Sequence, residues 1–210
     1  ITAGVPPADY QTIETFDLEL TLNQSGFPFT TGGSIYSSPL ILDIDQDGSD
    51  EIVFGSDDYS VYALGSDGSE EWSFATGSQV RGSAAAADLE GDGDIEIVFC
   101  SKDQKCYILN SDGSLQAEYS ANGFLMTAPV LRDLDGDGDL EIIFGGFAKY
   151  LYVIHHDGTD FGSFPLYVDE SIMVAPAVGD IDNDGSEENP FATINKALDV
   201  SFDGDTILVH

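Results

Sequence analysis

Four short segments of the chain carry carboxylates at alternate positions. Each follows the pattern Asp-x-Asp/Glu-x-Asp-Gly-x-x-Glu, and the copies begin at Asp43, Asp88, Asp133 and Asp180. The first residues of successive copies lie 45, 45 and 47 positions apart, and each copy holds five acidic residues. About half of the 39 acidic residues of the protein therefore gather in four short loops.

This spacing is suited to binding a divalent cation. Side chains at positions 1, 3 and 5 converge when the chain coils tightly, and the glycine at position 6 permits the sharp turn. The carbonyl of position 7 and the glutamate at position 9 complete a shell of hard oxygen ligands, which favours Ca²⁺. We expect up to four structural calcium ions. The candidate ligands are Asp43, Asp45, Asp47, Ser49, Glu51, Asp88, Glu90, Asp92, Asp94, Glu96, Asp133, Asp135, Asp137, Asp139, Glu141, Asp180, Asp182, Asp184, Ser186 and Glu188.

Three alternative interpretations of the acidic loops, namely a solvated turn, a site for a different metal and an EF-hand, fit less well than a calcium site. A single Asp-Gly segment is common as a solvated turn, but four copies in register that all end in glutamate favour metal binding. Mg²⁺ prefers fewer protein ligands, and the loops contain no His or Cys for Zn²⁺ or Cu²⁺. An EF-hand loop needs a carboxylate at position 12. Position 12 is occupied here by Phe54, Phe99, Phe144 and Phe191.

The overall charge narrows the classes of partner. The chain has 210 residues, with 39 Asp and Glu against 6 Lys and Arg, a net charge of −33. Such a chain repels the phosphate backbone, so we expect no nucleic-acid partner. The absence of a long apolar run argues against membrane insertion. With 42% hydrophobic residues, the chain still has enough apolar material for a packed core.

The residues around each loop predict four β-strands per unit of about 45 residues. A short apolar segment precedes the loop, and β-branched and aromatic runs such as 52–55 and 61–64 follow it. An Asp-Gly turn then leads into a weaker strand. Four-stranded units at this period are typical of propeller blades. We therefore predict an all-β propeller with blades at 34–80, 81–125 and 126–172.

The two ends of this region can combine into a composite fourth blade. Residues 16–22 alternate as a half-buried strand does, and 27–30 continue them as the outer hairpin of a blade. Residues 173–188 supply an inner strand and the fourth acidic loop. We expect a lead-in at 1–15 and propeller repeats at 16–188. A partial ring, completed by further blades or by self-association with another chain, is the alternative.

The repeats resemble the FG-GAP/VCBS repeats of integrin-α-like β-propellers. The resemblance rests on the acidic loop, the Ile-Ile-Phe-Gly-Gly run at 142–146 and the Ala-Pro pairs at 128–129 and 175–176. It implies that carboxylates at positions 1, 3, 5 and 9 hold Ca²⁺ between the first two strands of a blade. Position 9 is Glu here, where the family more often has Asp, and Glu90 stands at position 3 of the second copy.

The last segment, 189–210, departs from the repeat. Asn189 and Pro190 suit the start of a helix, and apolar residues from Phe191 to Leu198 share one helical face. A turn and the strand-like run 206–209 follow. This short helix-strand tail resembles the segment that leads into a right-handed parallel β-helix domain. We interpret it as a truncated second domain or as a latch on the propeller.

Two cysteines and two histidines are the candidate reactive side chains. Cys100 and Cys106 are expected on paired strands, and we predict a disulfide between them, which suits an oxidising exterior. His155 and His156 occupy a hairpin turn and are interpreted as tolerated turn residues. We find no nucleophile motif, zinc signature or phosphate loop, which favours a non-catalytic role over an enzymatic one without deciding between them.

The rim opposite the acidic loops is predicted to form a ligand face. Four of the six cationic residues and several aromatic or sulfur-containing side chains are expected there, and such segregation is typical of binding surfaces. The residues are Tyr36, Tyr59, Arg81, Lys102, Lys105, Met126, Phe147, Lys149 and Met173. The favoured function is a secreted, calcium-stabilised module for extracellular binding or adhesion to protein or carbohydrate. The alternative is a lyase-like polysaccharide-active enzyme, or its non-catalytic propeller portion.

Overall fold

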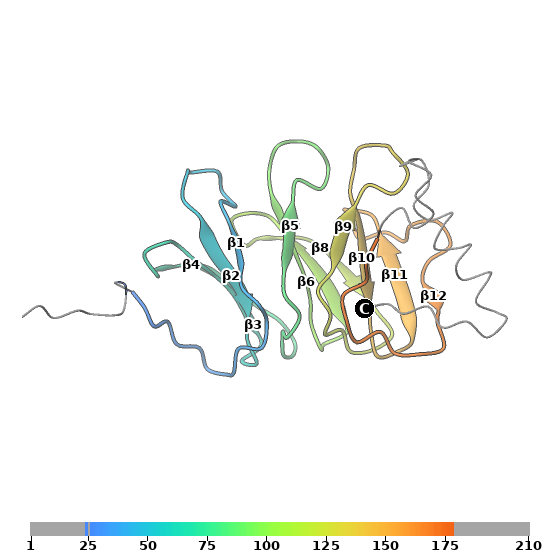
Figure 1. Ribbon diagram of the computed structural model, residues 1–210, viewed down its shortest axis with the longest axis horizontal. Helices are drawn as coiled ribbons and strands as arrows, with labels where there is room; N and C mark the ends of the chain where they lie inside the picture. The colour runs from blue at the N-terminus through green and yellow to red at the C-terminus, as the bar shows by residue number, and fades with distance from the viewer. Residues whose placement is uncertain (1–23, 25, 179–210) are drawn as a thin grey trace, which may run out of the picture.

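The computed structural model describes residue 24 and residues 26–178, which form three four-stranded antiparallel sheets. The first sheet contains β1 (Leu40–Leu42), β2 (Glu51–Gly55), β3 (Ser60–Leu64) and β4 (Glu70–Ala75). The second contains β5 (Ala85–Ala87), β6 (Glu96–Cys100), β7 (Lys105–Leu109) and β8 (Leu115–Ser120). The third contains β9 (Val130–Arg132), β10 (Glu141–Gly145), β11 (Tyr150–Ile154) and β12 (Leu166–Tyr167). Figure 1 shows the sheets side by side, with β1, β5 and β9 in a row.

Each sheet is a meander in which consecutive strands pair. The two middle strands of each sheet carry β-branched and aromatic residues and are largely buried, as in β6, where all five residues are buried. The fourth strands alternate between half-buried and exposed positions, which is typical of strands with one solvated face. Three blades with four strands each are thus confirmed, within the predicted ranges.

The third blade has a shorter outer strand than the other two. Strand β12 contains two residues, whereas β4 and β8 contain six. In this repeat Gly162 and Pro165 interrupt the segment after the Asp-Gly turn. Proline has no N–H to donate to a strand ladder, and glycine weakens a strand interior. After an isolated bridge between Ile154 and Asp160, strand pairing with β11 therefore resumes only at Leu166 and Tyr167.

Aromatic side chains pack neighbouring blades together. Phe74 on β4 meets Phe99 and Tyr107 of the second blade edge-on, with ring centroids 6.1 and 5.3 Å apart. Tyr119 on β8 makes the same contacts with the third blade, and Phe29 makes them with the first. Phe29 therefore takes the place of an outer-strand aromatic of a preceding blade. Continuous hydrophobic cores join the first blade to the second and the second to the third.

Some of the predicted elements fall on segments outside the described residues. These are the lead-in at 1–15, the strand at 16–22, the fourth acidic loop at 180–188 and the tail at 189–210. The composite fourth blade and the domain boundaries therefore stay predictions. In the described part of the chain, no helix has the length and apolar character needed to cross a membrane.

Candidate metal centres

The acidic nonapeptides form the loops between the first and second strand of each blade. In every described copy, the glutamate at position 9 begins the second strand and is almost completely buried. The exposed fractions of Glu51, Glu96 and Glu141 are 1%, 2% and 0%. One carboxylate oxygen of each accepts the N–H of the apolar residue at position 2. The donors are Ile44, Leu89 and Leu134, at 2.9, 2.9 and 2.8 Å.

Hydrogen bonds inside each loop hold the chain in a tight coil. The first aspartate accepts the N–H of the glycine at position 6, as Asp43 Oδ2 does from Gly48 at 3.0 Å. The aspartate at position 5 accepts the N–H of position 7, as Asp47 does from Ser49 at 2.8 Å. Gly48 has a φ of 95°, which L side chains rarely adopt. The same bonds recur in the second and third copies.

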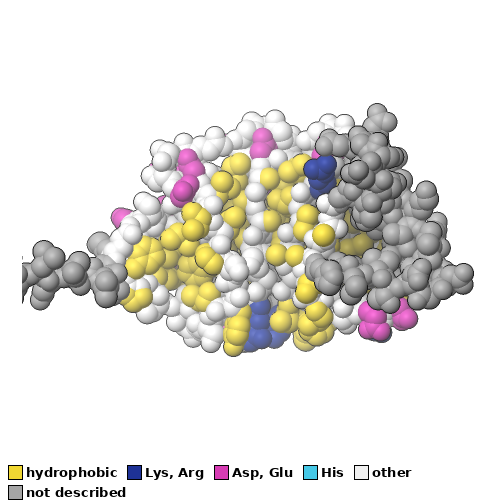
Figure 2. All heavy atoms as spheres, viewed as in Figure 1, with side chains coloured by type: hydrophobic (Ala, Val, Ile, Leu, Met, Phe, Trp, Pro, Cys, Tyr) yellow, Lys and Arg dark blue, Asp and Glu magenta, His cyan; other side chains and the backbone are white. Residues whose placement is uncertain are grey.

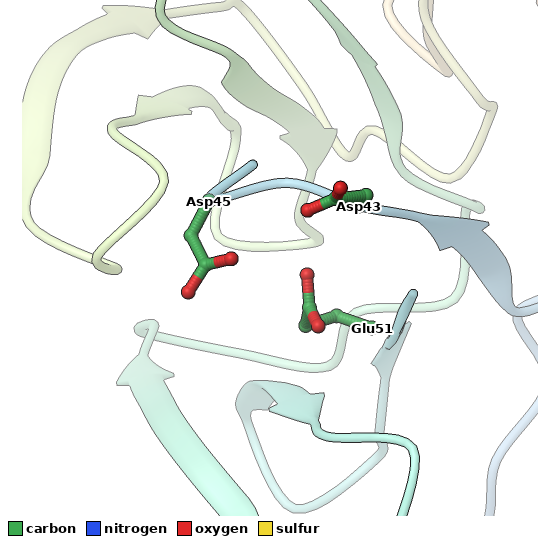
Figure 3. A group of neighbouring side chains, drawn as sticks. All are labelled: Asp43, Asp45 and Glu51. Carbon is green, nitrogen blue, oxygen red and sulfur yellow. The ribbon is translucent and has the colours of Figure 1, made fainter. Parts of the chain in front are cut away.

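This coil brings three carboxylates of each loop close together. In the first blade, the oxygens of Asp43, Asp45 and Glu51 lie within 4.8 Å of one another. Figure 3 shows the three side chains pointing toward a common space. The corresponding groups in the other blades are Glu90, Asp92 and Glu96, and Asp133, Asp135 and Glu141. Each group offers the oxygen-only donor set that hard divalent cations prefer.

Two buried oxygens in these groups have no hydrogen-bond donor among the described residues. They are Asp43 Oδ1 in the first loop and Glu141 Oε1 in the third. A buried carboxylate oxygen without a donor is costly, because it loses its hydration and gains nothing in return. A cation bound at each of these two loops would satisfy the buried oxygen there.

The electrostatics of the loops also favour a cation. Burial raises the pKa of Glu51, and the nearby carboxylates of Asp45, Asp47 and Asp43 raise that pKa further, against the lowering effect of the Ile44 N–H. The pKa values of Glu96 and Glu141 are raised for the same reasons. These raised pKa values mean that several carboxylates lie close together at a site where water hydrates them poorly. A bound dication would offset this repulsion.

The remaining predicted ligands occupy other places in the loops. The second group contains Asp92 and does not include Asp88. Both carboxylate oxygens of Asp88 accept N–H groups of its own loop. Asp47, Ser49, Asp94, Asp137 and Asp139 lie in the described loops but outside the three groups. The fourth copy, Asp180, Asp182, Asp184, Ser186 and Glu188, lies outside the described residues.

Three side chains lie beside the acidic groups although the repeat pattern does not place them there. The charges of Glu51, Asp45 and Asp47 contribute to a raised pKa of Glu71, for which burial is the largest cause. His155 Nδ1 lies 3.3 Å from Glu141 Oε1. The two ring nitrogens of His156 each lie 3.5 Å from a carboxylate, Glu90 in the second loop and Asp139 in the third. In an antiparallel meander the turn between the third and fourth strands lies on the same rim as the loop between the first and second. The predicted strand order therefore already indicates that side chains of this turn lie near the acidic loops.

The opposite rim carries the predicted ligand face, with its cations paired inside the molecule. Arg81 forms two 2.8 Å hydrogen bonds with Asp57 and lies over the Tyr36 ring, 4.5 Å from its centroid. Lys102 contacts Gln79 and lies over Phe124. Lys105 pairs with Glu118, and Lys149 donates to the carbonyl of Asp169.

The apolar members of this face remain accessible. Tyr36, Tyr59, Phe147 and Met173 are 64%, 50%, 40% and 51% exposed, and Met126 is half-buried. Figure 2 shows cationic atoms flanked by hydrophobic ones at the middle of the lower edge, with acidic atoms farther to the right on that edge. Acidic atoms and a further cationic group lie toward the upper edge, where the acidic loops are.

The two cysteines face each other in the second blade. Cys100 on β6 is directly opposite Cys106 on β7, both are completely buried, and both are free thiols in this structure. Burial raises the pKa of the Cys100 thiol well above its ordinary value. The disulfide stays a prediction.

Consecutive four-stranded antiparallel blades, each with an acidic coil between its first two strands, define a β-propeller with an acidic loop in every described repeat. The profile of the FG-GAP-like repeat matches residues 43–99 and 133–188, and the chain belongs to this family. No curated protein matches the chain significantly.

A solved structure of similar fold is that of BamB from Moraxella catarrhalis. The two chains are 17% identical and superpose with a TM-score of 0.54, over 72% of this chain and 43% of that one. This likeness supports the propeller fold alone. The chain matches less than half the length of that protein.

Proposed function

We propose that the chain is a calcium-stabilised propeller module, in which Ca²⁺ has a structural role. The observation that carries the proposal is the convergence of a buried glutamate and two further carboxylates in three equivalent loops. The donors are hard oxygens in number and spacing that suit Ca²⁺, and the orphaned oxygens of Asp43 and Glu141 fit such an ion. The ion supplies positive charge at a point where the chain provides only negative charge.

A structural role is favoured because the loops also connect adjacent blades. Gln46 Nε2 in the first loop donates to the carbonyl of Gly93 in the second. Leu140 N–H in the third loop donates to the carbonyl of Leu89, 2.7 Å away. Ordering one loop around a cation therefore also restrains the loop next to it.

Thermal unfolding with and without metal tests this role. Extracellular sites bind Ca²⁺ at about 10⁻⁴–10⁻³ M, so about 1 mM Ca²⁺ would add roughly 0.4–1.4 kcal/mol per site. We expect Tm to fall substantially in excess EDTA and to return on addition of Ca²⁺. An identical melting curve in both conditions would contradict the proposal.

We further propose that the module acts outside the cell, binding protein or carbohydrate through the rim opposite the loops. Exposed Tyr36, Phe124 and Phe147 support this, because flat aromatic side chains are enriched at recognition surfaces. The cations of this rim are already paired, which favours stacking over capture of an anionic ligand. A glycan array and a pull-down with extracellular matrix proteins test the proposal, with Tyr36→Ala as the variant. Turnover of an acidic polysaccharide into an unsaturated product would instead favour the lyase.

A further inference from the structure

One position inside the acidic loops carries a different type of residue in the first blade than in the other two. Position 4 is Gln46 in the first loop, Gly91 in the second and Gly136 in the third. All three have a left-handed backbone, with φ of 60°, 69° and 80°. Glycine adopts this conformation freely, whereas a residue with a Cβ does so at a cost in free energy. The first loop thus keeps a glutamine where glycine would be less strained.

The Gln46 side chain extends from the first loop to the second. Its amide nitrogen, Nε2, donates to the carbonyl of Gly93. The N–H of Asp94, the next residue, donates to Asp92 Oδ1 at 2.9 Å. The Gly93 carbonyl and the Asp94 N–H belong to one planar peptide group. Holding this carbonyl therefore also orients the hydrogen bond to Asp92, a member of the second acidic group.

In its own loop, Gln46 lies between two residues of the acidic coil. Asp45 belongs to the first acidic group, and its Oδ1 accepts the N–H of Asp47 at 3.1 Å. A cation bound by Asp45 would therefore fix the backbone on both sides of Gln46, and with it the direction in which the side chain leaves the loop. Gln46 thus connects a carboxylate of the first group to a carboxylate of the second.

The second and third loops are connected in another way. The N–H of Leu140, at position 8 of the third loop, donates to the carbonyl of Leu89 at 2.7 Å. Within the described residues, no equivalent main-chain bond joins Ile95 of the second loop to Ile44 of the first. Gln46 therefore provides between the first two loops a connection that the backbone provides between the second and third.

We propose that Gln46 couples the first two cation sites, so that an ion bound in either loop raises the affinity of the other. The inference rests on the proposed cation-binding role of the loops. An ion in the first loop orders Gln46 and, through it, the Gly93 carbonyl, so the second loop loses less conformational entropy when its own ion binds. The coupling is reciprocal, because both orders of binding lead to the same doubly bound state.

Calorimetric titration of the EDTA-stripped protein with Ca²⁺ tests the coupling, with Gln46→Gly as the variant. This substitution leaves the net charge unchanged, so electrostatic repulsion between bound ions is the same in both proteins. It also introduces the residue that the other two loops have at this left-handed position. We expect the variant to melt no lower than the wild type in EDTA, yet to have an overall Ca²⁺ binding constant about 2- to 10-fold lower, the net value of one hydrogen bond.

Two controls separate coupling from a local effect of the substitution. Gln46→Asn keeps the amide and tolerates the left-handed backbone, but it is one methylene shorter, so it should bind Ca²⁺ as Gln46→Gly does. In a Glu51→Gln background, where the first site is lost, Gln46→Gly should leave the affinity of the remaining sites nearly unchanged. The two substitutions thus form a double-mutant cycle that isolates the coupling.

The outcomes distinguish the coupling from the calcium role itself. Coinciding isotherms of the wild type and Gln46→Gly would overturn the coupling and leave the calcium role intact. An equal loss of affinity with and without Glu51 would also overturn it, because Gln46 would then act without an ion in the first loop. Wild-type affinity in Gln46→Asn would do the same, since the contact with Gly93 would not matter. No Ca²⁺ uptake by the wild type would overturn both proposals.

Discussion

Replacing Glu51 by Gln should change stability in opposite directions with and without calcium. The Glu51 side chain is almost completely buried, and burial together with the charges of Asp45, Asp47 and Asp43 raises its pKa. At neutral pH and without metal, the charged form is therefore unfavourable in the folded state. Gln removes the charge, and its carbonyl oxygen can still accept the N–H of Ile44. In EDTA, Glu51→Gln should be at least as stable as the wild type.

In calcium the same substitution should destabilise the protein. Loss of one site removes about 0.4–1.4 kcal/mol at roughly 1 mM Ca²⁺, for dissociation constants of about 10⁻⁴–10⁻³ M. For a chain of this length, 1 kcal/mol corresponds to about 2–4 °C in Tm. We therefore expect Tm of the variant to lie about 1–6 °C below that of the wild type in Ca²⁺.

Scanning calorimetry of both proteins, in Ca²⁺ and in EDTA, measures this crossover. Asp50→Asn is the control, because Asp50 lies in the same loop, is exposed and is not a predicted ligand. Its effect should be small and similar in both buffers. If Glu51→Gln changes Tm equally in both buffers, the Glu51 charge does not contribute to binding a cation, and the reasoning about a cation is refuted.

Three further predictions concern pH, packing and redox state. The raised pKa values of Glu51, Glu96 and Glu141 mean that the folded state binds protons more readily than the unfolded state. Metal-free protein should therefore gain stability as pH falls from about 7 toward about 5, whereas Ca²⁺ should oppose this trend. Melting scans in EDTA and in Ca²⁺ measure the pH dependence, and a loss of stability at lower pH in EDTA would contradict the prediction. Phe99→Ala removes a completely buried ring between two blades and should cost about 3–5 kcal/mol by urea unfolding, with a cost below about 1 kcal/mol refuting the interblade core. Cys100 and Cys106 should form a disulfide in protein exported through an oxidising compartment, because directly opposite strand positions fall within the Cα separation that a disulfide spans. The intact mass should then be two hydrogens lower than the mass expected from the Cys100→Ala variant after correction for the substitution, and two alkylatable thiols after export would contradict the prediction.

Local sequence patterns are enough to predict the blades and the loops. The strand runs and the acidic nonapeptides depend on near neighbours, so their spacing in the sequence carries over to the structure. The repeat pattern predicts a fourth strand in the third blade as in the others. Beyond an isolated bridge at Asp160, only Leu166 and Tyr167 pair as a strand there, because Gly162 and Pro165 interrupt the segment.

Contacts between blades are harder to anticipate, because they depend on how the sheets stack. Segregated charge predicts a cationic ligand face, yet Arg81 is paired with Asp57 from the preceding blade. The repeat pattern indicates that His155 and His156 are tolerated turn residues, whereas the stacking places His156 between Glu90 and Asp139, which belong to loops of different blades. Repeat alignment alone does not show which turn lies against which loop.

One turn position differs in residue type between the three repeats although its backbone hydrogen bond recurs in each of them. Gly65, Asn110 and His155 make the same turn hydrogen bond, so the backbone imposes little selection on the side chain at this position. Yet this turn lies on the rim of the acidic loops, and in the third blade its imidazole reaches the buried glutamate. Exchange at a single tolerant turn position can thus place a new side chain against an acidic loop without disturbing the coil that forms the loop.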